Sequence, residues 1–171
     1  SVSVNVAALH LKKENFVKSL KFLLDSHPNV LPQMLDIEIT ESVVIEHLPH
    51  VTQCLIACQD LGVTFSLDDF GTGYSSLSYL KQLPTQSIKI DKSFIRDILI
   101  DKDSLRLTKA IIGLAKSFNR EVIAEGVETV EHEVLLMNLG CDVAQGYGIA
   151  KPMPVEKVLS WVAKFVPAHL S

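Results

Sequence analysis

Short segments rich in apolar and β-branched residues alternate along the chain with longer segments of helical periodicity. The strand-like segments cover residues 2–6, 35–40, 63–68, 87–91, 121–124 and 142–147. The helical patterns cover residues 14–26, 49–61, 104–118, 130–139 and 155–166. This alternation is typical of βα units, in which successive strands run parallel and the helices pack on the sheet. The sequence therefore predicts an α/β fold of about six such units.

The pattern over residues 49–61 is the clearest helix. Its apolar face consists of Val51, Cys54, Leu55, Cys58 and Leu61, and Gly62 supplies a stop. The chain has three cysteines, too few for a disulfide framework and without zinc-ligand spacing, so we expect them to pack in the core. The six histidines match no catalytic motif, and we expect surface or capping positions for them.

Composition excludes several classes of protein. Hydrophobic residues make up 47% of the 171 residues and charged residues 21%, which is ordinary for a globular domain and excludes a disordered or coiled-coil chain. The net charge is −4 and there is no run of basic residues, so DNA is not an expected partner. No apolar run is long enough to cross a bilayer. With the low cysteine count, this favours a cytoplasmic location, although the parent protein could be tethered to a membrane.

Polar side chains stand at or near the ends of the predicted strands. In a parallel sheet the carboxyl ends of the strands meet at one edge, so these residues converge there. Converging carboxylates repel one another unless divalent cations lie between them, and oxygen ligands suit Mg²⁺, Mn²⁺ or Ca²⁺. The residues are Asn5, Glu38, Asp68, Asp69, Lys89, Asp91, Glu125 and Gln145.

A closed barrel of eight βα units usually takes about 250 residues, or about 200 at the short end. Nothing in the sequence marks a domain boundary, so we expect residues 1–171 to form a single domain. We also expect the barrel to be incomplete, with about six βα units present and the first strands missing.

Seven strings of residues follow one another along the chain in a recognisable order and spacing. They are Ser3-Val4-Asn5-Val6-Ala7, Glu38-Ile39-Thr40-Glu41-Ser42, Asp68-Asp69-Phe70-Gly71-Thr72-Gly73-Tyr74-Ser75-Ser76-Leu77, Ile88-Lys89-Ile90-Asp91, Ala124-Glu125-Gly126-Val127-Glu128-Thr129, Ala144-Gln145-Gly146-Tyr147 and Lys151-Pro152. In these strings the chain resembles the EAL-domain cyclic di-GMP phosphodiesterases over nearly its whole length. The family's Glu-Ala-Leu motif has no match before Ser1.

The resemblance implies a TIM-type (β/α) barrel and a metal-dependent hydrolase. Family members cleave one linkage of cyclic di-GMP to give linear pGpG, using two Mg²⁺ or Mn²⁺ ions, and Ca²⁺ is expected to inhibit. The resemblance also implies a homodimer and an upstream sensor or GGDEF-type domain in the parent chain. Because the glutamate of the missing motif is a metal ligand, we expect weakened metal binding by this chain alone.

Roles for individual residues follow from the resemblance. The implied metal ligands are Asn5, Glu38, Asp68, Asp69 and Asp91. The implied catalytic residues are Lys89, Glu125 and Asp69, with Lys89 contacting the attacking water or a phosphate oxygen and Glu125 acting as general base or as a metal-associated acid. Residues implied to contact the substrate or to support the site are Gln145, Glu41, Glu128, Gly71, Thr72 and Gly73, with Glu41 anchoring the glycine-containing loop.

Two alternatives stay open at the level of sequence. The first is a non-catalytic receptor that binds cyclic di-GMP and signals through partners. The second is a different metal-dependent phosphoesterase on an α/β scaffold, which is what the residues indicate without the resemblance. All the family motifs quoted above are intact, and this favours the enzyme.

Overall fold

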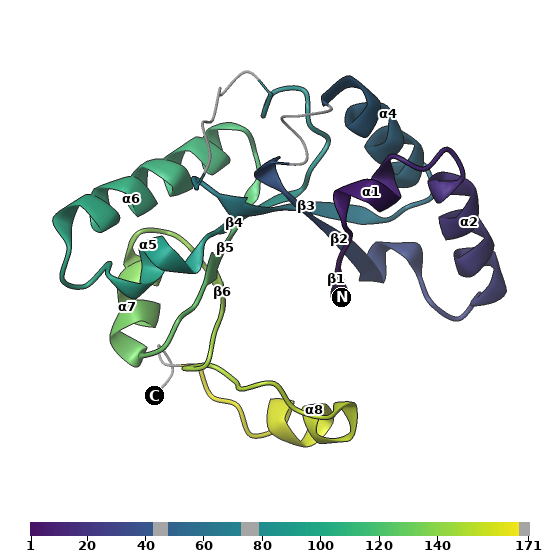
Figure 1. Ribbon diagram of the computed structural model, residues 1–171. Helices are drawn as coiled ribbons and strands as arrows, with labels where there is room; N and C mark the ends of the chain where they lie inside the picture. Colours follow the sequence, from purple (N-terminus) through teal and green to yellow (C-terminus); the bar gives the residue numbers. More distant parts are fainter. Residues whose placement is uncertain (43–47, 73–78, 168–171) are drawn as a thin grey trace. The chain divides into compact units, whose positions relative to one another are not determined.

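The computed structural model describes residues 1–42, 48–72 and 79–167. Strands and helices alternate along the described chain, as the sequence predicts (Figure 1). Its residues fall into two compact units. Unit 1 consists of Ser1–Lys89 with Ala115–Glu121, and unit 2 consists of Ile90–Leu114 with Val122–Ser171.

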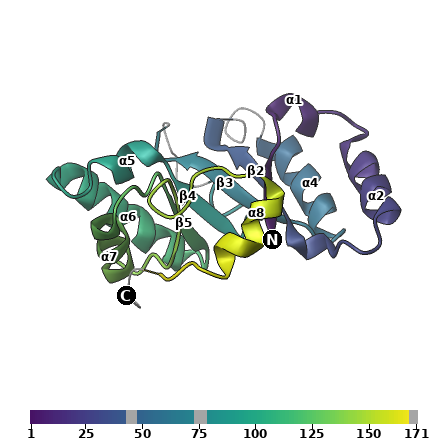
Figure 2. The ribbon, with the colours of Figure 1, turned by 90° about the horizontal axis from the view of Figure 1, so that it is seen from below.

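Unit 1 is built on parallel strands. Strand β1 (Val2–Asn5) pairs with β2 (Leu35–Thr40), which pairs with β3 (Thr64–Phe70), and β4 (Ser87–Ile90) follows β3 in the order of the sheet. The connections carry α1 (Ala8–Leu11), α2 (Phe16–Ser26), the 3₁₀ helix η1 (Pro32–Met34) and α4 (Leu48–Gln59). Helices α2 and α4 contact each other and lie side by side (Figures 1 and 2).

The central strands of unit 1 are buried on both faces. In β2 and β3 apolar and polar residues alternate, yet both kinds are shielded from solvent. Because successive side chains of a strand point to opposite faces, one face of each strand is apolar and the other polar. The apolar set is Ile37, Ile39, Phe65, Leu67, Ile88 and Ile90, and the polar set is Asp36, Glu38, Ser66, Asp68, Ser87 and Lys89. The candidate site residues Glu38, Asp68 and Lys89 belong to this polar face.

Unit 2 contains α5 (Lys92–Arg96), α7 (Val130–Asn138), β6 (Val143–Gln145) and α8 (Val155–Val162). Helix α6 (Lys102–Ser117) and strand β5 (Glu121–Glu125) lie mostly in this unit. Strands β5 and β6 pair in parallel, and α5 and α7 lie beside them (Figure 1). The core of the unit includes Ile95, Ile98, Ile111, Ile112, Val122, Ala124, Val127 and Leu136.

The predicted strands are confirmed, with shifts of up to two residues at their ends, and the strand over residues 35–40 has the predicted bounds. The last helix differs from the prediction of residues 155–166. It ends at Val162, where bonds such as the one from the Lys164 N–H to the Trp161 carbonyl (2.9 Å) tighten the chain into a turn. We also expected it to pack on the sheet, but α8 has no buried residue in the described structure.

The helix predicted over residues 49–61 is confirmed as α4, with Val51, Cys54, Leu55 and Cys58 buried on one side. All three cysteines are buried and free, as core packing requires. The pKa of the Cys58 thiol is raised by its contact with Cys54 and by burial. None of the described helices has the length and hydropathy of a membrane span.

Among the described histidines, His132 departs from the expected surface or capping position, while His47 and His169 lie outside the described residues. His132 is 5% exposed, so it is neither on the surface nor a cap. It lies in the first turn of α7, where Thr129 is the capping residue and its hydroxyl accepts a hydrogen bond from the His132 N–H. Within the described ranges, three short helices were also missed, namely α1, η1 and α5, because elements of three to five residues are too short to show a helical period.

Candidate functional site

The ends of β1, β2 and β3 bring three predicted metal ligands into neighbouring positions of unit 1. Asn5 and Glu38 are direct partners in the register of β1 and β2. Asp68 lies on the next strand, where it is the register partner of Thr40. Glu38 is 7% exposed and Asp68 is 9% exposed. Burial of two carboxyl groups is unusual unless positive charge compensates them.

Lys89 supplies positive charge to these carboxylates. Its Nζ atom lies 2.8 Å from Oε1 of Glu38 and 3.2 Å from Oδ1 of Asp68, and the residue is 3% exposed. An ammonium group is compact and carries three donors, so it can contact two carboxylates from different strands at once. Counting these three groups as ionised, two negative charges face one positive charge. The cluster retains one negative charge, which favours a further cation.

The backbone changes direction at the Asp68-Asp69 pair. Asp69 has a φ of 55°, a left-handed conformation that non-glycine residues seldom adopt, and Gly71 has a φ of 97°. The Asp69 N–H donates to Oδ1 of Asp68 at 3.1 Å. Strained backbone of this kind gathers at functional sites, where the surrounding structure maintains it. The result is a half-buried Asp69 carboxyl directly beside the buried Asp68.

Glu41 binds the backbone of Gly71 and the side chain of Tyr79. Its Oε2 accepts a hydrogen bond from the Gly71 N–H at 3.2 Å, and its Oε1 accepts one from the Tyr79 hydroxyl at 2.6 Å. Glu41 is 2% exposed. The Thr72 hydroxyl donates to the Asp69 carbonyl at 2.8 Å and closes a local turn, while Gly73 lies outside the described residues.

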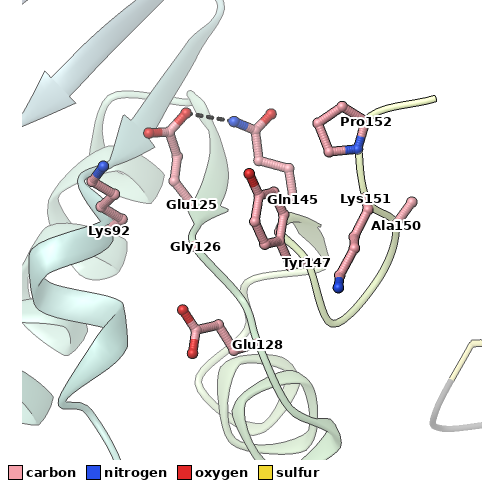
Figure 3. A pocket seen from close by; sticks show the side chains of 10 residues that line it. Lys92, Glu125, Gly126, Glu128, Gln145, Tyr147, Ala150, Lys151 and Pro152 are labelled. Atoms are coloured by element: carbon pink, nitrogen blue, oxygen red, sulfur yellow. Dashed lines mark hydrogen bonds between the residues drawn. The ribbon is translucent and has the colours of Figure 1, made fainter. Parts of the chain in front are cut away.

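In unit 2, Glu125 and Gln145 end two adjacent strands. They are register partners of β5 and β6, and the Gln145 side-chain amide donates to Oε1 of Glu125 at 2.7 Å (Figure 3). This bond orients the Glu125 carboxylate. Both residues line a pocket of about 580 Å³ within the unit. Glu128 also lines this pocket and is exposed.

Gly146 allows the loops after β5 and β6 to approach each other closely, and Gly126 allows the loop after β5 to approach α5. The Val127 N–H donates to the Gln145 carbonyl at 3.1 Å, and the Gly148 N–H donates to the Val127 carbonyl at 2.9 Å. A Cβ atom on Gly146 would lie 2.1 Å from the Val127 carbonyl oxygen. A Cβ on Gly126, which has a φ of 74°, would lie 2.6 Å from that of Lys92. The glycines therefore set the shape of the pocket wall.

Sequence reasoning left several lining residues of this pocket without a role. Lys92, Tyr147 and Lys151 line it, and Figure 3 shows them from two segments of unit 2. The Gln-Gly-Tyr and Lys-Pro strings could have indicated two of them, because both strings match the family. Lys92 follows Asp91 directly in the sequence, but no pattern marked it.

Asp91 has a structural role that we did not predict. As the capping residue of α5, its Oδ1 accepts a hydrogen bond from the Ser93 N–H at 2.9 Å and another from the Ser93 hydroxyl. Aspartate is among the preferred residues at this position. The predicted site residues are thus distributed between the units: Asn5, Glu38, Glu41, Asp68, Asp69, Gly71, Thr72 and Lys89 lie in unit 1, and Asp91, Glu125, Glu128 and Gln145 lie in unit 2.

Comparisons with curated proteins give relatives in several bacteria. The chain is 41% identical over 157 residues to Signaling protein YkoW of Bacillus subtilis. It is 39% identical over 163 residues to the bifunctional diguanylate cyclase/cyclic di-GMP phosphodiesterase MucR of Pseudomonas aeruginosa, and 38% identical over 165 residues to the cyclic di-GMP phosphodiesterase PdeR of Escherichia coli. These matches cover 92%, 95% and 96% of the chain but only 20%, 24% and 25% of the relatives.

Solved structures show the same fold. The EAL domain of Mycobacterium smegmatis DcpA has a TM-score of 0.89 at 36% identity, covering 96% of this chain and 74% of that one. The c-di-GMP complex of the PaMucR phosphodiesterase has a TM-score of 0.88 at 38% identity, covering 92% of this chain and 64% of that one. The predicted fold class, the TIM-type α/β barrel of EAL domains, is therefore confirmed.

A family model described as EAL domain matches residues 1–152. This match includes every strand of the described structure and every predicted site residue. The chain belongs to the EAL domain family.

Proposed function

We propose that this chain is the hydrolytic part of a phosphodiesterase that opens one phosphodiester linkage of cyclic di-GMP and releases linear pGpG. The observation that carries the proposal is the buried cluster of Glu38, Asp68 and Lys89 on three strands of one parallel sheet. Two relatives, MucR and PdeR, are named as cyclic di-GMP phosphodiesterases, and PaMucR has been solved as a c-di-GMP complex. These names support the choice of substrate.

The donor atoms of the predicted ligands suit a hard divalent cation. The predicted ligands are carboxylates and one amide, which offer oxygen atoms, and the buried cluster retains a negative charge that a cation would balance. Asn5, Glu38, Asp68, Asp69 and Asp91 would hold two Mg²⁺ or Mn²⁺ ions. When bound, such ions neutralise the phosphate and lower the pKa of a bound water.

The remaining residues have roles that their contacts support. Lys89 keeps an ammonium group at the strand ends, where it would favour the negative charge that develops on a phosphate oxygen. Glu125, oriented by the amide of Gln145, would accept the proton of the attacking water. Glu41 would keep the backbone at Gly71 in place through its two hydrogen bonds.

The pocket of unit 2 has the chemistry of a site for an anionic ligand with aromatic bases. Lys92 and Lys151 bring positive charge to its lining, and Tyr147 brings an aromatic ring (Figure 3). Cations attract phosphate, and an aromatic ring offers a surface on which a base can stack. We assign to this pocket a part of the cyclic dinucleotide.

Several properties of the parent protein belong to the same proposal. We propose that residues 1–171 act as one EAL domain in the cytoplasm, as a homodimer, and beside a sensor or GGDEF-type domain. The support is the greater length of the relatives, of which the chain spans about a fifth to a quarter. Light scattering of the purified chain tests the dimer, because a monomeric mass at all concentrations contradicts it.

The activity is tested by incubating the chain with cyclic di-GMP and separating the nucleotides by chromatography. We expect pGpG to form with Mn²⁺ or Mg²⁺ and not with Ca²⁺. Glu38→Gln is the inactive comparison, because it keeps the shape of the side chain but removes a charge from the buried cluster. A high metal concentration is used, since metal binding is expected to be weakened.

The result also separates the enzyme from the receptor. If cyclic di-GMP binds with micromolar or tighter affinity, as measured by calorimetry, but is never cleaved, the chain is a receptor and the enzymatic proposal is wrong. If pGpG forms equally well in Glu38→Gln, the residues assigned here are wrong.

A further inference from the structure

A second set of polar side chains lies in unit 1, two residues before the assigned ones on the same strands. Since side chains of a strand alternate between faces with a period of two, each member of this set points to the same face as an assigned residue. The set consists of Ser3, Asp36, Ser66 and Ser87, which precede Asn5, Glu38, Asp68 and Lys89 respectively. We call these four residues the lower polar layer.

Asp36 is the centre of this layer. Its Oδ2 accepts hydrogen bonds from the Ser66 hydroxyl at 2.6 Å and the Ser3 hydroxyl at 3.3 Å, and its Oδ1 accepts one from the Thr64 hydroxyl at 2.8 Å. The hydroxyls of Ser66 and Ser87 are 2.5 Å apart. Because the single hydroxyl proton of Ser66 is donated to Asp36, Ser87 must be the donor to Ser66. One carboxyl group thus connects β1, β2, β3 and β4.

Stability alone does not explain a buried carboxyl group at Asp36. It is 8% exposed, and no described lysine, arginine or histidine forms an ion pair with it. An apolar side chain at this position would avoid the desolvation of a carboxyl group. Retaining a fully hydrogen-bonded polar group in a core makes sense where a unique arrangement of the strands is required.

We propose that Asp36 is a positioning residue, which fixes the strands so that Lys89 reaches Glu38 and Asp68 together. The proposal rests on the proposed function only in taking these three residues as part of the site. Glu38, Asp68 and Lys89 come from β2, β3 and β4, three of the strands that the lower polar layer connects. Replacing a side chain that hydrogen-bonds directly to a metal ligand commonly changes metal affinity by about 10- to 100-fold. Asp36 bonds to Ser3, Thr64 and Ser66 rather than to the ligands, so we expect an effect at the lower end of this range.

The test uses Asp36→Asn, which keeps the shape of the side chain but replaces one acceptor oxygen by a donor. The matched control is Ile37→Val, a conservative change at the next residue of β2, on the opposite and apolar face. The first measurement is the ¹H–¹⁵N NMR signal of the Lys89 ammonium group in metal-free protein, identified by its loss in Lys89→Met. Burial and two ion pairs slow the exchange of this group with water. We expect Asp36→Asn to broaden or remove the signal and Ile37→Val to leave it unchanged.

The second measurement is the Kd for Mn²⁺ by electron paramagnetic resonance. We expect the Kd to rise by about tenfold in Asp36→Asn and to change less than about threefold in Ile37→Val. Ser66→Ala serves if Asp36→Asn does not fold. It removes one donor and the connection to Ser87, and it should weaken the Lys89 signal in the same direction.

The outcomes are distinct. If the folded Asp36 or Ser66 variant keeps both the Lys89 signal and the Mn²⁺ affinity of the control, the positioning role is overturned. If the wild-type chain cleaves no cyclic di-GMP but Asp36→Asn still loses the Lys89 signal, the proposed function fails and the positioning role stands.

Discussion

The ammonium nitrogen of Lys89 lies 2.8 Å from a carboxylate oxygen of Glu38, on a strand that is 51 residues earlier in the sequence. Both side chains are almost fully buried. In such surroundings the ion pair compensates charges that would otherwise be desolvated without a partner.

Replacing Lys89 by methionine should therefore destabilise the metal-free chain. The substitution leaves Glu38 and Asp68 buried without their ammonium partner, and we expect the free energy of unfolding to fall by about 3–5 kcal/mol. Urea unfolding followed by circular dichroism, with a chelator present, measures the change. Lys81→Met, at an exposed position, should change stability by less than about 0.5 kcal/mol. Equal stabilities of the two variants would contradict the assigned role of the ion pair.

The bond between Tyr79 and Glu41 should contribute measurably to stability. Tyr79→Phe removes the 2.6 Å hydrogen bond and leaves a buried carboxylate oxygen with less hydrogen bonding, so we expect a loss of about 1.5–3 kcal/mol. A double-mutant cycle with Glu41→Ala, which removes the acceptor, isolates the interaction, and the two changes should not be additive. Additive losses would show that the two side chains do not interact in solution.

Replacement of two different glycines by alanine should change the free energy of unfolding in opposite directions. Gly146→Ala places a Cβ atom 2.1 Å from the backbone oxygen of Val127, where nothing flexible can move aside, and we expect a loss of about 3 kcal/mol or more. Gly113→Ala, within α6 and with no atom within 4 Å of the added Cβ, should stabilise the chain by about 0.5–1 kcal/mol. Thermal unfolding of both variants measures the two changes in stability. If Gly146→Ala is not destabilising, the loop after β6 does not contact the backbone of Val127.

The residue before α6 should give one pH-dependent contribution to stability. The pKa of Asp101 is lowered, chiefly by hydrogen bonds from the side chain and backbone of Ser104. Because the folded pKa lies below the unfolded value, the contribution is present above the unfolded pKa and is lost as the pH falls through the folded pKa. Asp101→Ala should therefore be less stable than wild type at about pH 7, and the difference should shrink as the pH falls through the folded pKa of Asp101. Asp101→Asn can still cap the helix, and its stability should lack this dependence on pH. A difference that is unchanged at low pH would contradict the assignment.

Local patterns determined most of the secondary structure. The strand over residues 35–40 and the buried side of α4 follow from periods of two and 3.6 residues, which depend only on neighbours in the sequence. Local composition also predicts where each strand ends. The polar residues of the family motifs lie at or beside these predicted strand ends.

Tertiary structure decided which polar residues are partners. The contacts of Lys89 with Glu38, of Tyr79 with Glu41 and of Ser66 with Asp36 join residues at least 30 positions apart. They depend on which strands are adjacent and in which register, and no local period encodes either. The same holds for the early end of β6, since Gly146 leaves the strand to pack against the backbone of Val127. The sequence by itself thus determined where strands, helices and polar strand ends lie, and the packing of the strands decided which of these side chains meet.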